Sequence, residues 1–122
     1  MNVLIFDDDL DMLEVCSIIL KNKGYNVFTC ANCNNIIDTV QHANPQVIIM
    51  DNWIPDTGGI VASQSIKTHQ DYKNIPIIYF SANNDIEALS KRAGADAFIK
   101  KPFDIEDIEL LVDKLCARQL QP

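Results

Sequence analysis

The stretch "VLIFDDDL", residues 3–10, sets four consecutive apolar residues directly before three carboxylates. A short run that is apolar at every position is typical of a strand covered on both faces, as in a parallel sheet. Two further runs of this kind, "VIIM" at 47–50 and "IIYF" at 77–80, follow. The carboxylates of Asp7, Asp8 and Asp9 lie where the first strand should end, and adjacent like charges repel one another. The stretch therefore predicts a parallel sheet whose first strand ends at a site that compensates this charge.

Apolar runs alternate with helical patterns along the whole chain. Strands are expected at residues 2–6, 25–29, 47–50, 75–80 and 97–99. Helices are expected at 10–23, 34–43 and 59–69, at 84–94 behind a capping box of Asn84 and Glu87, and from Asp104 onward. The second strand contains Asn26 and Thr29, which indicates an edge position. Strict alternation with short connections predicts a doubly wound α/β domain with a five-stranded parallel sheet of order 2-1-3-4-5.

Length and composition predict one soluble domain that spans residues 1–122. Apolar residues make up 48% of the chain and charged residues 22%, which is ordinary for a globular protein. The net charge of −7 argues against nucleic-acid binding, because phosphate backbones select basic surfaces. No apolar run reaches membrane-spanning length, and no basic segment precedes "MNVLIF" as in a signal peptide. We therefore expect a cytoplasmic protein that binds no membrane.

The four cysteines are expected to be structural. Cys30 and Cys33 form a CxxC motif, "CANC", but a zinc site would need a second ligand pair with comparable spacing. A redox motif would usually open a helix directly after a buried strand and carry Trp, Gly or Pro. Cys16 and Cys116 fall at apolar positions of expected helices, and cysteine is a common core residue in reducing compartments.

Polar side chains follow four of the five expected strands. In open α/β sheets ligands bind beyond the carboxyl ends of the strands, at the point where the strand order reverses. Asp7 and Asp8 follow the first strand and Asp51 follows the third, so the three carboxylates should converge there. Clustered carboxylates need a cation, and Mg²⁺ takes oxygen ligands. Ser81 and Lys101, after the fourth and fifth strands, add a hydroxyl and an ammonium, so the arrangement suits receipt of a phosphoryl group.

Four fragments, in this order along the chain, resemble the receiver domain of two-component response regulators. They are "LIFDDD", "VIIMDNWIPDTGG", "PIIYFSA" and "AGADAFIKKPF". Together with the last helix they cover essentially the whole chain. The resemblance implies the flavodoxin-like, CheY-like (βα)5 fold, and a function in a two-component phosphorelay.

The resemblance also implies a role for each acidic residue. Asp51 matches the phosphoacceptor, which takes its phosphoryl group from a histidine kinase or a histidine phosphotransfer protein. Asp7 and Asp8 match the acidic pair that holds Mg²⁺, with Asp51 and the backbone carbonyl of Trp53 as further ligands. Such a domain is no enzyme toward other substrates, because it catalyses only its own phosphorylation and dephosphorylation.

Three further residues match the switch and the catalytic lysine of the family. Ser81 matches the residue that turns toward the phosphoryl group, and Phe98 the aromatic switch that moves inward on activation. Lys101 matches the invariant lysine, and its bond to Pro102 is expected to be cis. Partner binding in the family typically uses the face of the fourth helix, fifth strand and fifth helix. The oligomeric state implied is a monomer or a phosphorylation-dependent dimer.

Some residues depart from the family pattern or have simpler interpretations. Gly58 stands where many relatives carry an acidic residue, and Trp53 is bulky for its position, which should affect access and dephosphorylation. Asp9 is interpreted as an N-cap, and His42 and His69 as surface residues.

The sequence fits two other functions less well, and it allows two kinds of domain organisation. A haloacid-dehalogenase-type phosphatase would need Thr or Val where "DDDLD" carries Asp11, and a flavin-binding loop would not carry three aspartates. The chain is interpreted either as a stand-alone receiver or as the N-terminal part of a longer regulator.

Overall fold

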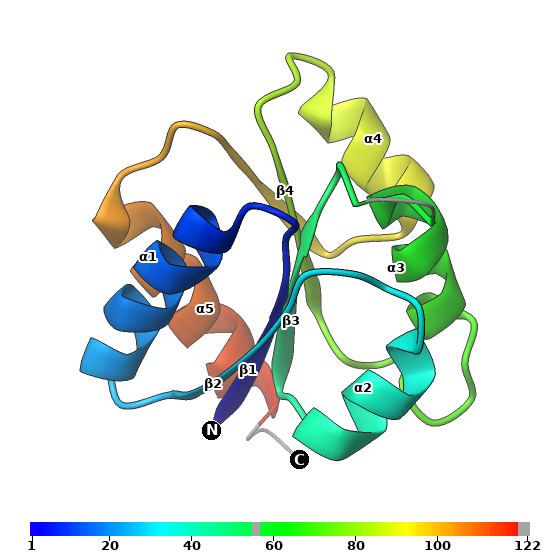
Figure 1. Cartoon of the computed structure of the whole chain (residues 1–122), viewed down its shortest axis with the longest axis horizontal. Coiled ribbons are helices and arrows are strands. Elements are labelled where there is room, and N and C mark those ends of the chain that lie inside the picture. The colour runs from blue at the N-terminus through cyan, green and yellow to red at the C-terminus, as the bar shows by residue number, and fades with distance from the viewer. Residues whose placement is uncertain (55–56, 120–122) are drawn as a thin grey trace.

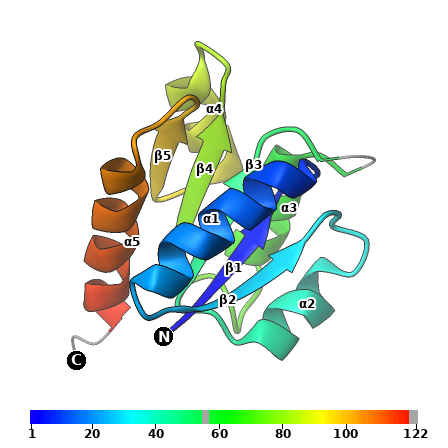
Figure 2. The same ribbon diagram turned by 60° about the vertical axis from the view of Figure 1, so that its left-hand side comes forward.

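The computed structural model describes residues 1–54 and 57–119. Strands and helices alternate along these residues (Figure 1), and the parallel sheet has the order β2-β1-β3-β4-β5, as predicted (Figure 2). The bounds are β1 Asn2–Phe6, α1 Leu10–Asn22, β2 Asn26–Cys30, α2 Ile36–Ala43, β3 Val47–Asp51, α3 Gly59–Lys67, β4 Ile77–Ser81, α4 Ile86–Ala93, β5 Ala97–Lys100 and α5 Ile105–Gln119.

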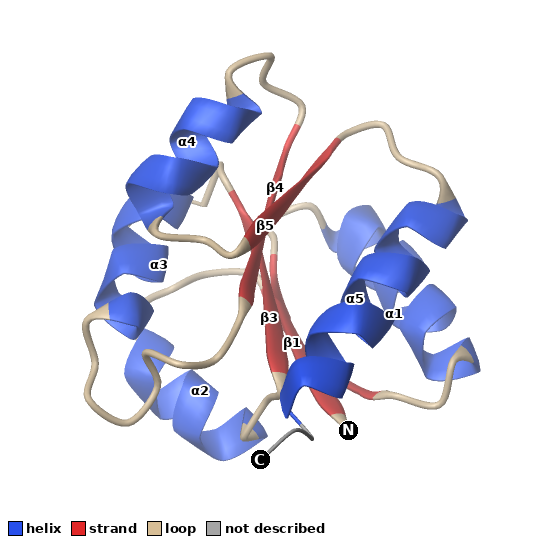
Figure 3. Cartoon of the chain, turned by 180° about the vertical axis from the view of Figure 1, so that it is seen from behind, coloured by secondary structure: helices blue, strands red, loops and turns tan. Residues whose placement is uncertain are grey.

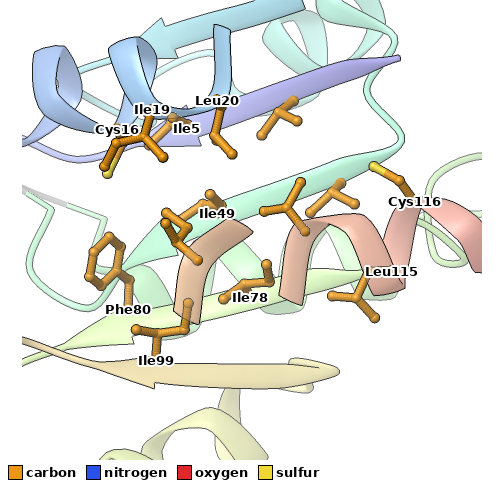
Figure 4. Close-up of a cluster of buried hydrophobic side chains, with 14 of the residues drawn as sticks. Ile5, Cys16, Ile19, Leu20, Ile49, Ile78, Phe80, Ile99, Leu115 and Cys116 are labelled. Carbon is orange, nitrogen blue, oxygen red and sulfur yellow. The ribbon is translucent and has the colours of Figure 1, made fainter. Parts of the chain in front are cut away.

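Helices cover both faces of the sheet. Helices α1 and α5 lie on one face, and α2, α3 and α4 lie on the other (Figures 2 and 3). Along β1, Val3 and Ile5 enter the core under α1 and α5, whereas Leu4 and Phe6 enter the opposite core. Figure 4 shows the first of these cores, between α1, α5 and the sheet. Because successive side chains of the inner strands are all buried, these strands need apolar residues at every position, which explains the continuous runs in the sequence.

The start of the inner strand β4 and the starts of two helices differ from the predictions in detail. Strand β4 begins at Ile77, two residues later than expected, and α2 begins at Ile36. Helix α4 begins at Ile86, and its N-cap Asp85 makes no side-chain capping bond, so the capping box predicted for Asn84 and Glu87 is wrong. The Asn84 amide oxygen instead accepts a hydrogen bond of 2.7 Å from the Lys100 ammonium.

Other local predictions are confirmed. The Asp9 carboxylate caps α1, since it accepts hydrogen bonds of 3.0 and 3.3 Å from the N–H groups of Asp11 and Met12. The Lys101–Pro102 peptide bond is cis. Of the two histidines, His42 is exposed, whereas His69 is half-buried and stacks on Tyr72.

The four cysteines are free thiols. Cys16 and Cys116 are buried in the core under α1 and α5, as predicted. Cys33 is buried in the opposite core, where burial and the neighbouring Cys30 thiol raise its pKa to about 12. A thiol with so high a pKa is a poor nucleophile at neutral pH, which fits a structural role for this residue.

Within residues 1–54 and 57–119, no helix is both long enough and apolar enough to cross a membrane.

Candidate functional site

The carboxyl ends of four strands meet around one cavity of about 530 Å³. Asp7 follows β1, Asp51 ends β3, Ser81 ends β4 and Lys101 follows β5, so the parallel order of the sheet brings them to one edge. Their side chains line the cavity together with those of Asp8, Asp9, Asn52, Trp53, Ala82 and Asn83. The structure therefore brings together all the predicted site residues except Phe98.

Lys101, Asp7 and Asp51, which all line this cavity, form an ion-pair triad. The Lys101 Nζ atom lies 2.8 Å from Asp51 Oδ1 and 3.1 Å from Asp7 Oδ2. The side chains of Asp7 and Asp51 are 1% and 7% exposed, so both carboxylates depend on protein groups in place of water. The Lys101 ammonium also stands 4.5 Å from the centroid of the Phe80 ring, a cation–π distance that further fixes its position.

Burial and charge shift the pKa values of the triad. Burial raises the pKa of Asp51 above its ordinary value, and the negative charge of Asp7 adds to this, against the opposing hydrogen bond from Lys101. Burial alone would lower the pKa of Lys101, but its hydrogen bonds and ion pairs with the two carboxylates outweigh burial and raise it. Lys101 therefore stays an ammonium, while ionised Asp51 gains from any further positive charge in the cavity.

The geometry fits a hard divalent cation. Asp7, Asp8 and Asp51 each offer a carboxylate oxygen, and these ligand atoms all lie within 4.8 Å of one another. Asp8 is exposed to solvent, so an ion held there would keep some of its waters, as Mg²⁺ usually does. Three carboxylates face one ammonium, which leaves negative charge for such an ion to neutralise.

Backbone hydrogen bonds orient the two buried carboxylates. Asp51 Oδ2 accepts a bond of 3.0 Å from the Trp53 N–H, and Asp7 Oδ1 accepts one of 3.0 Å from the Asp9 N–H. Each carboxylate thus has one oxygen bonded to the backbone and the other bonded to Lys101. Trp53 lines the cavity and is 75% exposed to solvent.

Gly59 allows the start of α3 to lie close to the end of β3. A Cβ at this position would lie 2.2 Å from the Asp51 carbonyl oxygen and 2.9 Å from the Asn52 Cα. The Gly59 N–H also donates a 3.1 Å hydrogen bond to the Asn52 carbonyl. The first residue of α3 is therefore packed directly against the chain that carries Asp51.

Comparison with known proteins identifies the family. A sequence model of the response regulator receiver domain matches residues 3–113. The chain belongs to this family. It is 30% identical over 114 residues to sporulation initiation phosphotransferase F of Bacillus subtilis, covering 92% of this chain and 90% of that protein. It is 28% identical to response regulator Rre1 of Synechocystis, covering 97% of this chain but 52% of that protein. The chain thus spans about half the length, or less, of several curated relatives that it matches.

Solved structures of receivers share the fold. The receiver domain of sensor histidine kinase PA1611 from Pseudomonas aeruginosa superposes with a TM-score of 0.86 at 23% identity, covering 95% of this chain and 97% of that chain. That structure was solved with a magnesium ion coordinated in its active site cleft.

Of the two predicted switch residues of this receiver, Ser81 lines the acidic cavity and Phe98 does not. The Ser81 hydroxyl, in a side chain that is almost fully buried, accepts a 3.0 Å hydrogen bond from the Asn83 N–H. Phe98 is 42% exposed and lines a different cavity, between α4, β5 and α5, together with Lys91 and Leu111. Sequence reasoning did not assign functions to Asn52, Phe80 or Asn83, because their contacts with the site arise from the register of neighbouring strands and from turn geometry.

Proposed function

We propose that this receiver accepts a phosphoryl group on Asp51 from a histidine kinase or a histidine phosphotransfer protein, in a Mg²⁺-dependent reaction. One observation carries the proposal: Asp51 lies 2.8 Å from the Lys101 ammonium, inside a cluster of carboxylates whose ligand atoms lie within 4.8 Å of one another. A nucleophilic carboxylate, a fixed cation and clustered oxygen ligands are what phosphoryl transfer to an aspartate requires.

The transfer proceeds by displacement at phosphorus. A carboxylate oxygen of Asp51 attacks the phosphorus atom of a phosphohistidine, a new O–P bond forms, and the P–N bond to the imidazole breaks. The imidazole leaves with the electron pair of that bond, and takes up a proton as its own acid–base equilibrium requires. The Lys101 ammonium and the Ser81 hydroxyl, which line the same cavity as Asp51, would donate hydrogen bonds to the phosphoryl oxygens, where negative charge is concentrated.

The proposed metal ligands are Asp7, Asp8, Asp51 and the Trp53 carbonyl. Their hard oxygen donors suit Mg²⁺, and the ion supplies positive charge against the phosphoryl oxygens. The magnesium ion in the cleft of the Pseudomonas receiver supports this assignment by analogy. Asp7 holds the Lys101 ammonium, and Lys101 in turn bonds to Asp51, so the nucleophile is oriented before a phosphodonor arrives.

The output side of the proposal concerns the face of α4, β5 and α5. Aspartyl phosphate adds negative charge and acceptor oxygens, toward which Ser81 turns, and Phe98 then moves inward from its exposed position. This change presents a new surface to a downstream protein in the cytoplasm. The domain catalyses its own phosphorylation and dephosphorylation only, and acts as a monomer or as a phosphorylation-dependent dimer.

Acetyl phosphate provides a test that needs no partner protein. We expect the protein to gain one phosphoryl group by intact mass when Mg²⁺ is present, and to gain none after chelation. Asp51→Asn should remain unmodified, while Asp9→Asn, which alters an acidic residue of the same cavity outside the proposed ligand set, should be phosphorylated normally. Absence of any phosphoryl uptake by the wild-type protein, or equal uptake by Asp51→Asn, would refute the assignment.

A further inference from the structure

The buried hydroxyl of Tyr79 has its hydrogen-bond partner beside the proposed phosphoacceptor. Tyr79 lies in the middle of β4, and its side chain is fully buried in the core under α2, α3 and α4. Its O–H donates a hydrogen bond to the side-chain oxygen of Asn52, the residue that follows Asp51. A buried hydroxyl needs such a partner, so this contact fixes both side chains.

Asn52 is held at three points. Its N–H donates a 2.9 Å hydrogen bond to the Phe80 carbonyl, and its own carbonyl accepts the 3.1 Å bond from the Gly59 N–H. The Tyr79 hydroxyl holds the side chain as the third point. The backbone between Asp51 and Trp53 therefore cannot rotate without breaking one of these bonds.

The position of the Tyr79 hydroxyl is set by the core and not by the loop. In the register of the sheet Tyr79 lies beside Met50, one residue before Asp51. Burial and the charge of Asp51 raise the pKa of Tyr79 to about 12, so the hydroxyl keeps its proton throughout the physiological range and donates a hydrogen bond to Asn52. The core thus presents a fixed donor to a half-buried loop residue.

We propose that Tyr79 is a positioning residue for the metal site, acting through Asn52. By fixing the Asn52 side chain it holds the segment that carries Asp51 and the Trp53 carbonyl, and so strengthens binding of a divalent cation to the acidic cluster. This inference rests on the proposed function, since it concerns the same Mg²⁺ site. It adds a residue to that site that neither lines the cavity nor offers a ligand.

The test is a Mg²⁺ titration of the full chain that follows the fluorescence of Trp53, the single tryptophan of the sequence. Tyr79→Phe removes one oxygen from the core and should weaken Mg²⁺ binding by roughly tenfold, as loss of an outer-shell partner commonly does. Tyr72→Phe is the matched control, because Tyr72 stacks on His69 in the α3–β4 connection, and its Mg²⁺ affinity should equal that of the wild type. Asn52→Ala should weaken binding to a similar extent.

A double variant separates positioning from a general loss of stability. If Tyr79 acts through Asn52, Tyr79→Phe should cause no further loss of Mg²⁺ affinity when Asn52→Ala is already present. A purely structural role would lower the free energy of unfolding in urea and leave the Mg²⁺ affinity of the folded protein unchanged. If Tyr79→Phe does not fold, Tyr79→Met, which also lacks the hydroxyl and has a flexible side chain that can fill the core, replaces it in the same comparison with Asn52→Ala.

The outcomes distinguish this inference from the proposed function. The inference would be overturned if Tyr79→Phe bound Mg²⁺ as tightly as the wild type, or if the losses of Mg²⁺ affinity of the two single variants simply added in the double variant. In either case the proposed function would stand as long as the wild-type protein binds Mg²⁺. A wild-type protein that binds no Mg²⁺ would overturn both. Weaker and non-additive binding in the variants supports the positioning role.

Discussion

Substitution of Gly59 by alanine tests whether the close approach of α3 to the site is as tight as the structure indicates. The added Cβ would lie 2.2 Å from the Asp51 carbonyl oxygen, well inside van der Waals contact, and 2.9 Å from the Asn52 Cα. Both neighbours are backbone atoms that cannot rotate away as a flexible side chain could. Either the first turn of α3 or the segment from Asp51 to Asn52 must therefore move.

The expected cost follows from three contributions. Overpacking of this kind costs about 1–3 kcal/mol, and loss of the hydrogen bond from Gly59 to Asn52 adds about 1 kcal/mol. Alanine returns up to about 1 kcal/mol through its higher helix propensity. The net destabilisation is about 2 kcal/mol, which corresponds to a fall in Tm of roughly 8 °C for a domain of this size.

Urea unfolding followed by circular dichroism measures this cost directly. Val61→Ala, on the exposed face of the same helix, is the control, and its free energy of unfolding should stay within about 0.5 kcal/mol of the wild type. Gly59→Ala should also weaken Mg²⁺ binding, because the displaced segment carries Asp51. A Gly59→Ala variant as stable as the wild type would show that the two segments have room to separate and would refute the reasoning.

Three further substitutions test the charges, the cap and the core. Asp51→Asn should raise the Tm at neutral pH in the absence of Mg²⁺, because folding raises the pKa of Asp51 and its ionised form therefore destabilises the native state. This gain in Tm should vanish as the pH falls below 3.8, the ordinary carboxyl value, and a gain that stays constant across pH would contradict the reasoning. Asp9→Ala should lower the free energy of unfolding by about 1 kcal/mol through loss of the α1 cap and leave Mg²⁺ affinity unchanged, whereas a large loss of affinity would make Asp9 a ligand. Cys16→Ser should lower the free energy of unfolding by about 1–3 kcal/mol in urea, since it buries a hydroxyl in an apolar core, and an unchanged value would mean that the hydroxyl finds a partner.

The strand order could be predicted because strands that are buried on both faces have a recognisable, continuously apolar sequence. Inner strands of a sheet with helices on both faces need apolar residues at every position, so "VLIF", "VIIM" and "IIYF" mark β1, β3 and β4. The polar residue that follows each strand then falls at the same edge, and the convergence of Asp7, Asp51 and Lys101 follows from the topology alone.

Details that depend on contacts between distant residues could not be predicted. Asn84 and Glu87 have the spacing of a capping box, but the Asn84 side chain is bonded to Lys100 of β5, a contact that no local pattern indicates. The bond between Tyr79 and Asn52 likewise depends on the register of β3 and β4. A tyrosine inside an apolar run is indistinguishable, in the sequence, from any other core aromatic.

The central claim, that Asp51 is the phosphoacceptor, is tested most directly by locating the modified residue. After reaction with acetyl phosphate and Mg²⁺, borohydride reduces an aspartyl phosphate to homoserine, which tandem mass spectrometry assigns to a single position. The account predicts homoserine at position 51 and aspartate retained at positions 7, 8 and 9. Homoserine at one of those three positions, or at none of the four, would contradict it.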